Sequence, residues 1–95
     1  MMIKSFKCRD TEKLFNDLDV KKFRSISRAA RIKLELLNAT ISLNSLRVLP
    51  GNRLERLKGD KKGQYSIRIN EQWRICFIWQ AENAIEVEIV DYHKG

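Results

Sequence analysis

The segment Trp73-Arg74-Ile75-Cys76-Phe77-Ile78-Trp79 decides the fold expected for this chain. Its odd-numbered positions are all large and apolar, whereas Arg74 projects from the opposite side, which is the two-residue period of a β-strand with one buried face. Because Trp73, Phe77 and Trp79 share this parity, we interpret them as core residues rather than as an exposed stacking surface. A half-buried strand is therefore predicted here.

More strands are expected on both sides of this one. Residues 64–69 form a second candidate strand with Ile67 and Ile69 pointing inward, and residues 70–71 predict a tight reversal between the two. Downstream, Ile85-Glu86-Val87-Glu88-Ile89 alternates again after a polar turn. Upstream, residues 53–58 are compatible with a short strand that is followed by a turn at 59–63. An antiparallel meander is predicted for the second half of the chain.

The first half is expected to contain one strand and two helices. Residues 2–6 mix apolar and polar side chains as an N-terminal strand does, and Asp10 is the expected N-cap of a short helix. Residues 42–52 are expected to be an irregular connection, since Pro50-Gly51-Asn52 is a strong turn signal. A longer helix should begin near Ser25 or Ser27, and its core face should carry Ile26, Ala30, Leu34, Leu37 and Ile41. The fold class is therefore α+β.

Length and charge limit the possible functions. The chain has 95 residues, of which 43% are hydrophobic, so one core and a single domain over residues 1–95 are expected. Its formal net charge of +7 attracts polyanions, which makes nucleic acid the expected partner. No apolar run could span a membrane and no signal-peptide pattern occurs, so a cytoplasmic protein is expected. Cys8 and Cys76 are too far apart to suggest a disulfide framework or a metal site.

A basic run between residues 21 and 33 has two interpretations. It contains no acid, and we expect internal ion pairing to account for little of it. Its function would be to follow the phosphates of a nucleic acid, and the alternative is a solvated helix face opposed by acids of the first helix. The six basic residues are Lys21, Lys22, Arg24, Arg28, Arg31 and Lys33.

The residue types also permit RNA cleavage without a metal ion. That reaction needs a proton acceptor for the 2′-hydroxyl, a proton donor for the leaving oxygen and positive charge on the phosphate. Arg74 lies on the outward strand face, to which neighbouring strands could bring Arg68 and Lys58. His93 is the one histidine and titrates near neutral pH. Alternatively, His93 is an ordinary surface residue and the arginines merely solubilise the sheet.

Four blocks closely resemble the HigB toxin family: PGNRLERLKGD at residues 50–60, GQYSIRIN at 63–70, QWRICF at 72–77 and VEIVDYH at 87–93. The likeness extends over nearly the whole chain. It implies a RelE-like compact α+β domain with an N-terminal strand and two helices packed on a curved antiparallel sheet. It also implies a ribosome-dependent endoribonuclease that cuts messenger RNA in the ribosomal A site without cofactor or metal.

The same resemblance implies roles for individual residues. Asp91, Tyr92 and His93 match the C-terminal active-site motif of the family, and Lys58 and Arg74 match basic positions that bind RNA and stabilise the scissile phosphate. Further contacts to RNA are expected from Arg68, Arg53, Arg56, Lys61 and Lys62.

One residue departs from the family pattern. Some members carry a histidine where this chain has Glu55, so a mechanism with two histidines is not available. His93 must then share the proton transfers with Lys58 or with Glu55 itself. A carboxylate at this place repels the phosphate unless neighbouring bases compensate its charge.

The family further implies partners. The expected antitoxin is a helix-turn-helix protein of the HigA type, and operator DNA is bound only through the toxin–antitoxin complex. The expected targets are messenger RNA and the ribosome with its 16S rRNA. Two rivals remain: a non-catalytic module that blocks RNA or ribosomes, and a DNA-contacting regulator, which the absence of a helix-turn-helix pattern disfavours.

Overall fold

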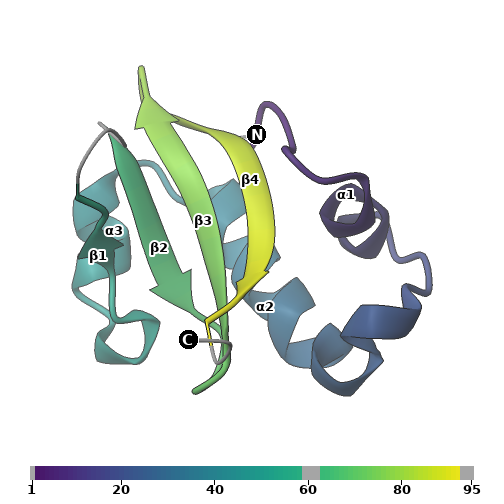
Figure 1. Cartoon of the computed structure of the whole chain (residues 1–95). Helices are drawn as coiled ribbons and strands as arrows, with labels where there is room; N and C mark the ends of the chain where they lie inside the picture. The colour runs from purple at the N-terminus through teal and green to yellow at the C-terminus, as the bar shows by residue number, and fades with distance from the viewer. Residues whose placement is uncertain (1, 59–62, 93–95) are drawn as a thin grey trace.

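The computed structural model of the chain describes residues 2–58 and 63–92. A four-stranded antiparallel sheet with the order β1-β2-β3-β4 follows the helices in sequence, which confirms the α+β class. In Figure 1 the sheet lies in front of α2 and α3, and α1 lies beyond β4. The elements are α1 (Arg9–Phe15), a 3-10 helix (Lys21–Ile26), α2 (Ser27–Ala39), α3 (Leu43–Arg47), a 3-10 helix (Pro50–Asn52), β1 (Glu55–Arg56), β2 (Gln64–Arg68), β3 (Trp73–Gln80) and β4 (Asn83–Asp91).

The core lies between α2 and the sheet. Four of the five apolar positions predicted for the second helix are buried, namely Ile26, Ala30, Leu34 and Leu37. Ile41 is 70% exposed, and its assignment to the core was wrong. The reason is that α2 ends at Ala39 and Thr40 is extended, so that the helical period no longer applies at residue 41.

The aromatic residues of β3 pack as predicted. Phe77 is buried, and Trp73 and Trp79 are partly buried against the same core. The ring of Trp73 meets Phe23 edge-on at 5.7 Å between centroids. Such aromatic contacts add to the stabilisation that comes from burying their area. These side chains therefore hold the sheet to the helical layer.

The predicted N-terminal strand is not present in residues 2–6. The backbone of this segment pairs with β4 through two isolated parallel bridges, Ile3 with Ala84 and Phe6 with Val87. The Ile3 amide instead donates to the side chain of Asn38 at the end of α2. Because the backbone groups of the segment divide between helix and sheet, no regular ladder forms.

The first helix begins two residues earlier than expected. Its N-cap is Cys8, which makes no side-chain capping bond. Asp10 and Glu12 lie in its first turn, where a negative charge interacts favourably with the helix dipole. Asp10 thus stabilises the helix start, but it is not the capping residue that the sequence suggested.

The connection at residues 42–52 is also more regular than predicted. Ser42 caps α3 by accepting a hydrogen bond from the Ser45 amide at 3.2 Å. After α3, the fully buried Asn52 donates to the Leu46 carbonyl at 3.1 Å and accepts from the Lys33 ammonium. Burial lowers the pKa of Lys33. The turn that leads into the sheet is therefore tied to both neighbouring helices.

The strands differ from expectation in length and in one register. β1 spans only Glu55–Arg56. Ile69 lies just beyond β2 and is half-buried, while Ile67 is fully buried as predicted.

The pairing of β3 with β4 shifts between Cys76 and Ile78. Opposite that shift Glu86 has a φ of 52°, and Ala84 and Val87 are buried while Ile85 is only half-buried. The simple alternation expected over residues 85–89 is thus wrong at this bulge. Apart from Gly63, the turn predicted at 59–63 lies outside the described residues.

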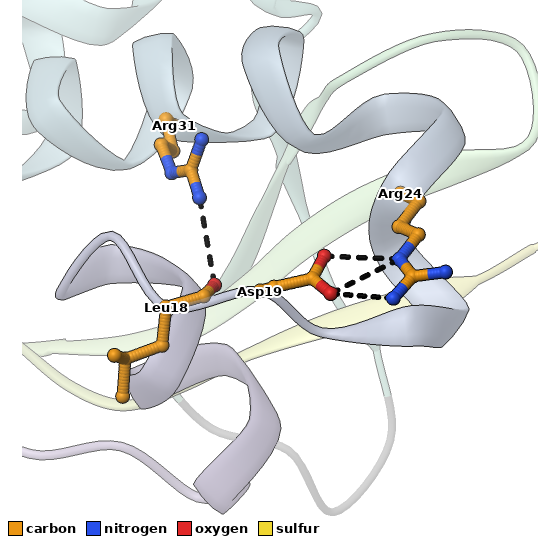
Figure 2. Close-up of polar contacts among 4 residues, drawn as sticks. All are labelled: Leu18, Asp19, Arg24 and Arg31. Carbon is orange, nitrogen blue, oxygen red and sulfur yellow. Dashed lines mark hydrogen bonds and ion pairs between the residues drawn. The ribbon is translucent and has the colours of Figure 1, made fainter.

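Three of the six bases of the basic run form ion pairs within the chain, which is more than predicted. Lys22 pairs with Asp10 at 3.3 Å and Arg31 with Asp17 at 3.3 Å. Figure 2 shows Asp19 joined to Arg24 by several contacts, and Arg31 donating to the Leu18 carbonyl. The Arg24 hydrogen bond holds the pKa of Asp19 below its usual range. Because α1 and the following loop pack beside α2, their acids meet bases that lie five to fourteen residues further along the chain.

These ion pairs favour the second interpretation of the run, a solvated helix face opposed by acids. The acids of α1 and of the loop after it oppose this helix face, as the alternative proposed. Within the described part of the chain, Lys21 and Arg28 make no ion pair.

None of the helices among the described residues is long and apolar enough to cross a membrane.

Candidate functional site

One face of the sheet carries the polar residues of the predicted site. Residues opposite each other in antiparallel strands share a face. The register pairs Arg68 with Arg74, Ser66 with both Cys76 and Glu55, and Cys76 with Glu88. These positions alternate with the buried Ile67, Ile75 and Val87, so they face away from the helices. That face is turned toward the viewer in Figure 1.

An open cleft of about 500 Å³ lies on this face. It brings together residues that are far apart in sequence: the turn before β1, the end of β2, the start of β3 and the residue that follows β4. Its lining residues are Arg53, Glu55, Arg68, Asn70, Glu71, Arg74 and Tyr92. Five of these seven were candidate site residues from the sequence, which confirms that they lie together but does not test their roles.

Arg74 is the most strongly held residue of the cleft. It is only 9% exposed, and its Nε donates to the Ser66 hydroxyl at 2.8 Å. Its Nη2 donates to the Arg53 carbonyl at 2.6 Å and lies 3.7 Å from a carboxylate oxygen of Glu55. Arg53 has a φ of 42°, a left-handed conformation, at the end of the 3-10 helix that precedes β1. The guanidinium is therefore fixed in position before any ligand arrives.

The remaining nitrogen of Arg74 is available to a ligand. The hydrogen bonds of Arg74 to described residues use Nε and Nη2 and leave Nη1 without a partner. Among the described side chains, no buried nitrogen or oxygen lacks a hydrogen-bond partner. Nη1 must therefore reach solvent in the cleft. A guanidinium with a free edge is well suited to bind a phosphate oxygen.

Tyr92 forms a wall of the cleft beside Arg74. The carbon of the Arg74 guanidinium lies 5.7 Å from the centre of the Tyr92 ring, which is within cation–π range. The tyrosine hydroxyl approaches the Cys76 sulfur at 3.8 Å. Burial raises the pKa of Tyr92 above its ordinary value, and the contact with Cys76 acts in the same direction. A hydrogen bond with Ser66 and the charge of Arg74 partly oppose this change.

Lys58 and Arg56 occupy different surroundings. Lys58 lines a second hollow of about 270 Å³, which shares Tyr92 with the cleft. Arg56 is opposite Tyr65, whose ring stacks on Phe77, so Arg56 lies toward the helical side at the edge of the sheet. Arg56 lines neither hollow. Of these two predicted RNA contacts, only Lys58 lies beside the cleft.

Asp91 lies apart from the cleft. It is opposite Trp73 in the β3–β4 pairing, which places it on the helical side of the sheet. Its carboxylate accepts a hydrogen bond from the Gln72 amide at 3.2 Å. Asp91 therefore holds the end of β4 to the start of β3. The predicted residues His93, Lys61 and Lys62 lie outside the described residues.

Sequence reasoning missed several residues of the site. Ser66, which accepts from Arg74, and Cys76, which contacts Tyr92, are in register on the outward face. Strand parity relative to Arg74 would have found both. Asn70 and Glu71 were interpreted only as a turn, and they line the cleft beside Arg68 and Arg74.

Fold and cleft together define a class: a small basic α+β protein whose sheet presents a preformed cleft lined by three arginines, two glutamates, an asparagine and a tyrosine. A family model described as the RelE-like toxin HigB of type II toxin-antitoxin systems matches residues 4–93. The chain therefore belongs to the HigB-like toxin family, as the sequence blocks predicted. Membership implies a cognate antitoxin.

Two curated proteins are similar in sequence. Toxin HigB-1 of Vibrio cholerae serotype O1 is 44% identical over 70 residues, which cover 74% of this chain and 73% of that protein. An uncharacterized protein of Haemophilus influenzae is 41% identical over 51 residues, which cover 54% of this chain and 48% of the relative. The first of these likenesses by itself supports the same family.

Proposed function

We propose that this toxin is a metal-independent endoribonuclease that cuts messenger RNA in the A site of the ribosome. The observation that carries the proposal is Arg74: a nearly buried guanidinium, held by Ser66 and the Arg53 carbonyl, with one edge open to the cleft. A preorganised cation at a developing charge stabilises a transition state without reorganising when the reaction occurs. Its neighbours Arg68 and Lys58 add charge that favours an RNA backbone.

The proposed reaction is an internal transfer at phosphorus. The 2′-oxygen of a ribose forms a bond to the adjacent phosphorus, the bond from phosphorus to the 5′-oxygen of the next nucleotide breaks, and a cyclic phosphate remains. One proton leaves the 2′-hydroxyl and another reaches the departing 5′-oxygen. Arg74 contacts the non-bridging oxygens, and Tyr92 donates a hydrogen bond to the substrate. These roles need Arg74 and Tyr92 side by side, which the 5.7 Å contact supports.

The proton transfers fall to His93 together with Lys58 or Glu55. The Glu55 carboxylate lies 3.7 Å from Arg74, so a base here has a cation beside it that offsets its repulsion of phosphate. We assign the proton acceptor to Glu55 and the donor to His93. Asp91, held by Gln72, positions the end of β4 that leads into Tyr92.

The family resemblance supports the proposed partners. The antitoxin is expected to be a helix-turn-helix protein of the HigA type, which neutralises the toxin and links it to operator DNA. The target, the ribosome with its messenger RNA, lies in the cytoplasm.

The test is primer-extension mapping of a defined messenger RNA on purified ribosomes, with a parallel reaction that omits ribosomes. The wild type is compared with Arg74→Ala, His93→Ala and Glu55→Gln, each shown to be folded by circular dichroism. Arg28→Ala is the matched control, because it removes the same charge from an exposed position on α2 that makes no ion pair with described residues.

The expected result is codon-positioned cutting that requires ribosomes, is lost in the first two variants, is reduced at least about tenfold in Glu55→Gln and is unchanged in the control. If Glu55→Gln cuts normally, Lys58 takes the second proton role. If translation stops without any cut, the protein is a non-catalytic inhibitor that occupies the ribosome, and the nuclease proposal fails.

A further inference from the structure

The second hollow on the outward face is built differently from the cleft. It holds about 270 Å³ and lies beside Tyr92, which lines both. Leu57 and Val90 contribute apolar walls, and the Glu88 carboxylate and the Gln64 amide contribute polar groups. Lys7 and Lys58 also line this hollow, and Lys7 pairs with the Glu88 carboxylate. Apolar walls with a few polar groups suit an aromatic heterocycle.

The position of the hollow also suits a nucleobase next to the reacting phosphate. The pair Arg68 and Arg74 lies two residues along the strands from the pair Ser66 and Cys76, a step of about 7 Å. Glu88 is opposite Cys76 in the neighbouring strand. This step is comparable with the distance from a phosphate to the base of its own nucleotide. A ribonucleotide whose phosphate contacts Arg74 can thus place a base in the hollow.

The polar groups of the hollow are available for recognition. Glu88 pairs with Lys7 at 3.7 Å through one oxygen, Oε1, and its side chain is 27% exposed. Neither the second oxygen of Glu88 nor the Gln64 side-chain amide bonds to any described residue. The Tyr92 ring is 44% exposed and stands at the rim. Exposed aromatic rings beside such sites stack on unpaired bases of RNA.

The geometry points to a nucleobase-reading subsite in this hollow, in which Tyr92 stacks on the base and Glu88 with Gln64 selects bases that carry an exocyclic amino group. The inference rests on the proposed RNA cleavage and adds that the toxin selects the RNA sequence that it cuts. An ionised carboxylate only accepts hydrogen bonds, so it fits the amino groups of adenine, cytosine and guanine. Uracil offers carbonyl oxygens on both sides of its one N–H and is repelled.

The experiment measures cleavage and binding separately. Messenger RNAs that differ at each of the three A-site codon positions are mapped on ribosomes with wild type, Glu88→Gln and Glu86→Gln. Glu86 is the matched control, since it is an exposed glutamate on the same strand that lies outside the hollow. In parallel, the binding of the toxin to ribosomes programmed with the same codons is measured. The messenger RNA in these ribosomes carries 2′-deoxyribose at the scissile position, so that it cannot be cut.

At one codon position the wild type should cleave roughly tenfold less when the base is uracil. A factor of this size is expected when one base edge is recognised by well-placed hydrogen bonds. Glu88→Gln should abolish most of that discrimination, because an amide can donate to a uracil carbonyl and accept from its N–H. Glu86→Gln should behave like the wild type. Gln64→Leu, which removes a second polar group, should weaken the preference as well and serves if Glu88→Gln fails to fold.

The outcomes separate the two proposals. Cutting with no position that disfavours uracil, or with discrimination unchanged in Glu88→Gln and Gln64→Leu, overturns the subsite and leaves the nuclease standing. Base-dependent binding that responds to Glu88→Gln without any cutting supports the subsite and refutes the nuclease. If neither cutting nor base-dependent binding occurs, both proposals fail.

Discussion

At the scale of single residues, Ser66 matters more than its small side chain suggests. It is fully buried, and its hydroxyl is the acceptor for Arg74 Nε at 2.8 Å. Arg74 contributes to catalysis only if its open edge faces the phosphate, so the residue that orients it controls that contribution. Ser66 is in this sense a positioning residue.

We expect Ser66→Ala to lower kcat by about tenfold with little change in KM, because the charge stays while its orientation loosens. The free energy of unfolding should fall by about 1–3 kcal/mol, since a buried donor loses its acceptor. Ser5→Ala is the matched control: its hydroxyl also accepts one bond, from the Glu86 amide at 2.9 Å, but outside the cleft. Equal losses of kcat in both variants would contradict a positioning role for Ser66.

The Tyr92 hydroxyl is expected to act as a hydrogen-bond donor and not as a base. Its pKa is raised, chiefly by burial, so it stays protonated throughout the neutral range. The folded chain binds this proton more tightly than the unfolded chain, whose tyrosine has a pKa of about 10. The resulting stability is present in full below about pH 10 and is lost as the pH rises through the folded-state pKa.

An ultraviolet titration checks this expectation. The difference between wild type and Tyr92→Phe near the phenolate absorbance should have its midpoint above pH 10. Tyr65→Phe serves as a control for the other tyrosine of the chain. A midpoint below 10 for Tyr92 would show that Arg74 and Ser66 outweigh burial.

At the scale of elements, the bulge in β4 determines which side chains reach the core. Glu86 has a φ of 52°, in the left-handed region that β-branched residues rarely adopt. Because of this extra residue, Ala84 and Val87 are both buried although they are three positions apart. The bulge also aligns Glu88 and Val90 with the outward face, where the second hollow lies.

Replacing Glu86 by isoleucine tests the bulge, since by propensity alone this change favours a strand. We expect it to lower the free energy of unfolding by about 1–2 kcal/mol in urea denaturation, because isoleucine resists a positive φ. Gln80→Ile, at an exposed position at the end of β3, should change stability by less than about 0.5 kcal/mol. A stabilised Glu86→Ile variant would show that the bulge is absent in solution.

At the scale of the whole molecule, the net charge of +7 is unevenly available to a ligand. Lys22, Arg24 and Arg31 are paired with acids of α1 and of the loop after it. On the outward face Arg53, Arg68 and Arg74 line one cleft, with Lys58 beside it. The field that attracts RNA should therefore be strongest over the sheet, although the densest basic run of the sequence lies in the helical half.

Salt dependence of binding to ribosomes distinguishes these surfaces. Each phosphate contact contributes about 0.9 to the slope of log K against log salt concentration. Arg68→Gln should reduce that slope by about one. Arg24→Gln removes the same charge from a residue already paired with Asp19 and should leave the slope nearly unchanged. If Arg24→Gln reduced the slope more than Arg68→Gln, the RNA-binding surface would lie on the helices and not on the sheet.

The sequence by itself determined the α+β class, the core face of α2, the strand at residues 73–79 and the family. These depend on periodicity and on local blocks of residues, which a linear chain displays directly. It also indicated five residues that line the cleft, because strand parity assigns Arg68 and Arg74 to one face and the family blocks supply Arg53, Glu55 and Tyr92.

Only the tertiary structure decided the rest, because those features depend on contacts between residues distant in the sequence. The ion pairs of the basic run join residues of different elements, and residues 2–6 fail to form a strand because α2 takes part of their hydrogen bonding. The bulge at Glu86 arises from pairing with β3, which local alternation does not contain. Likewise, the fixed orientation of Arg74 needs Ser66 and the Arg53 carbonyl, which come from two other segments of the fold.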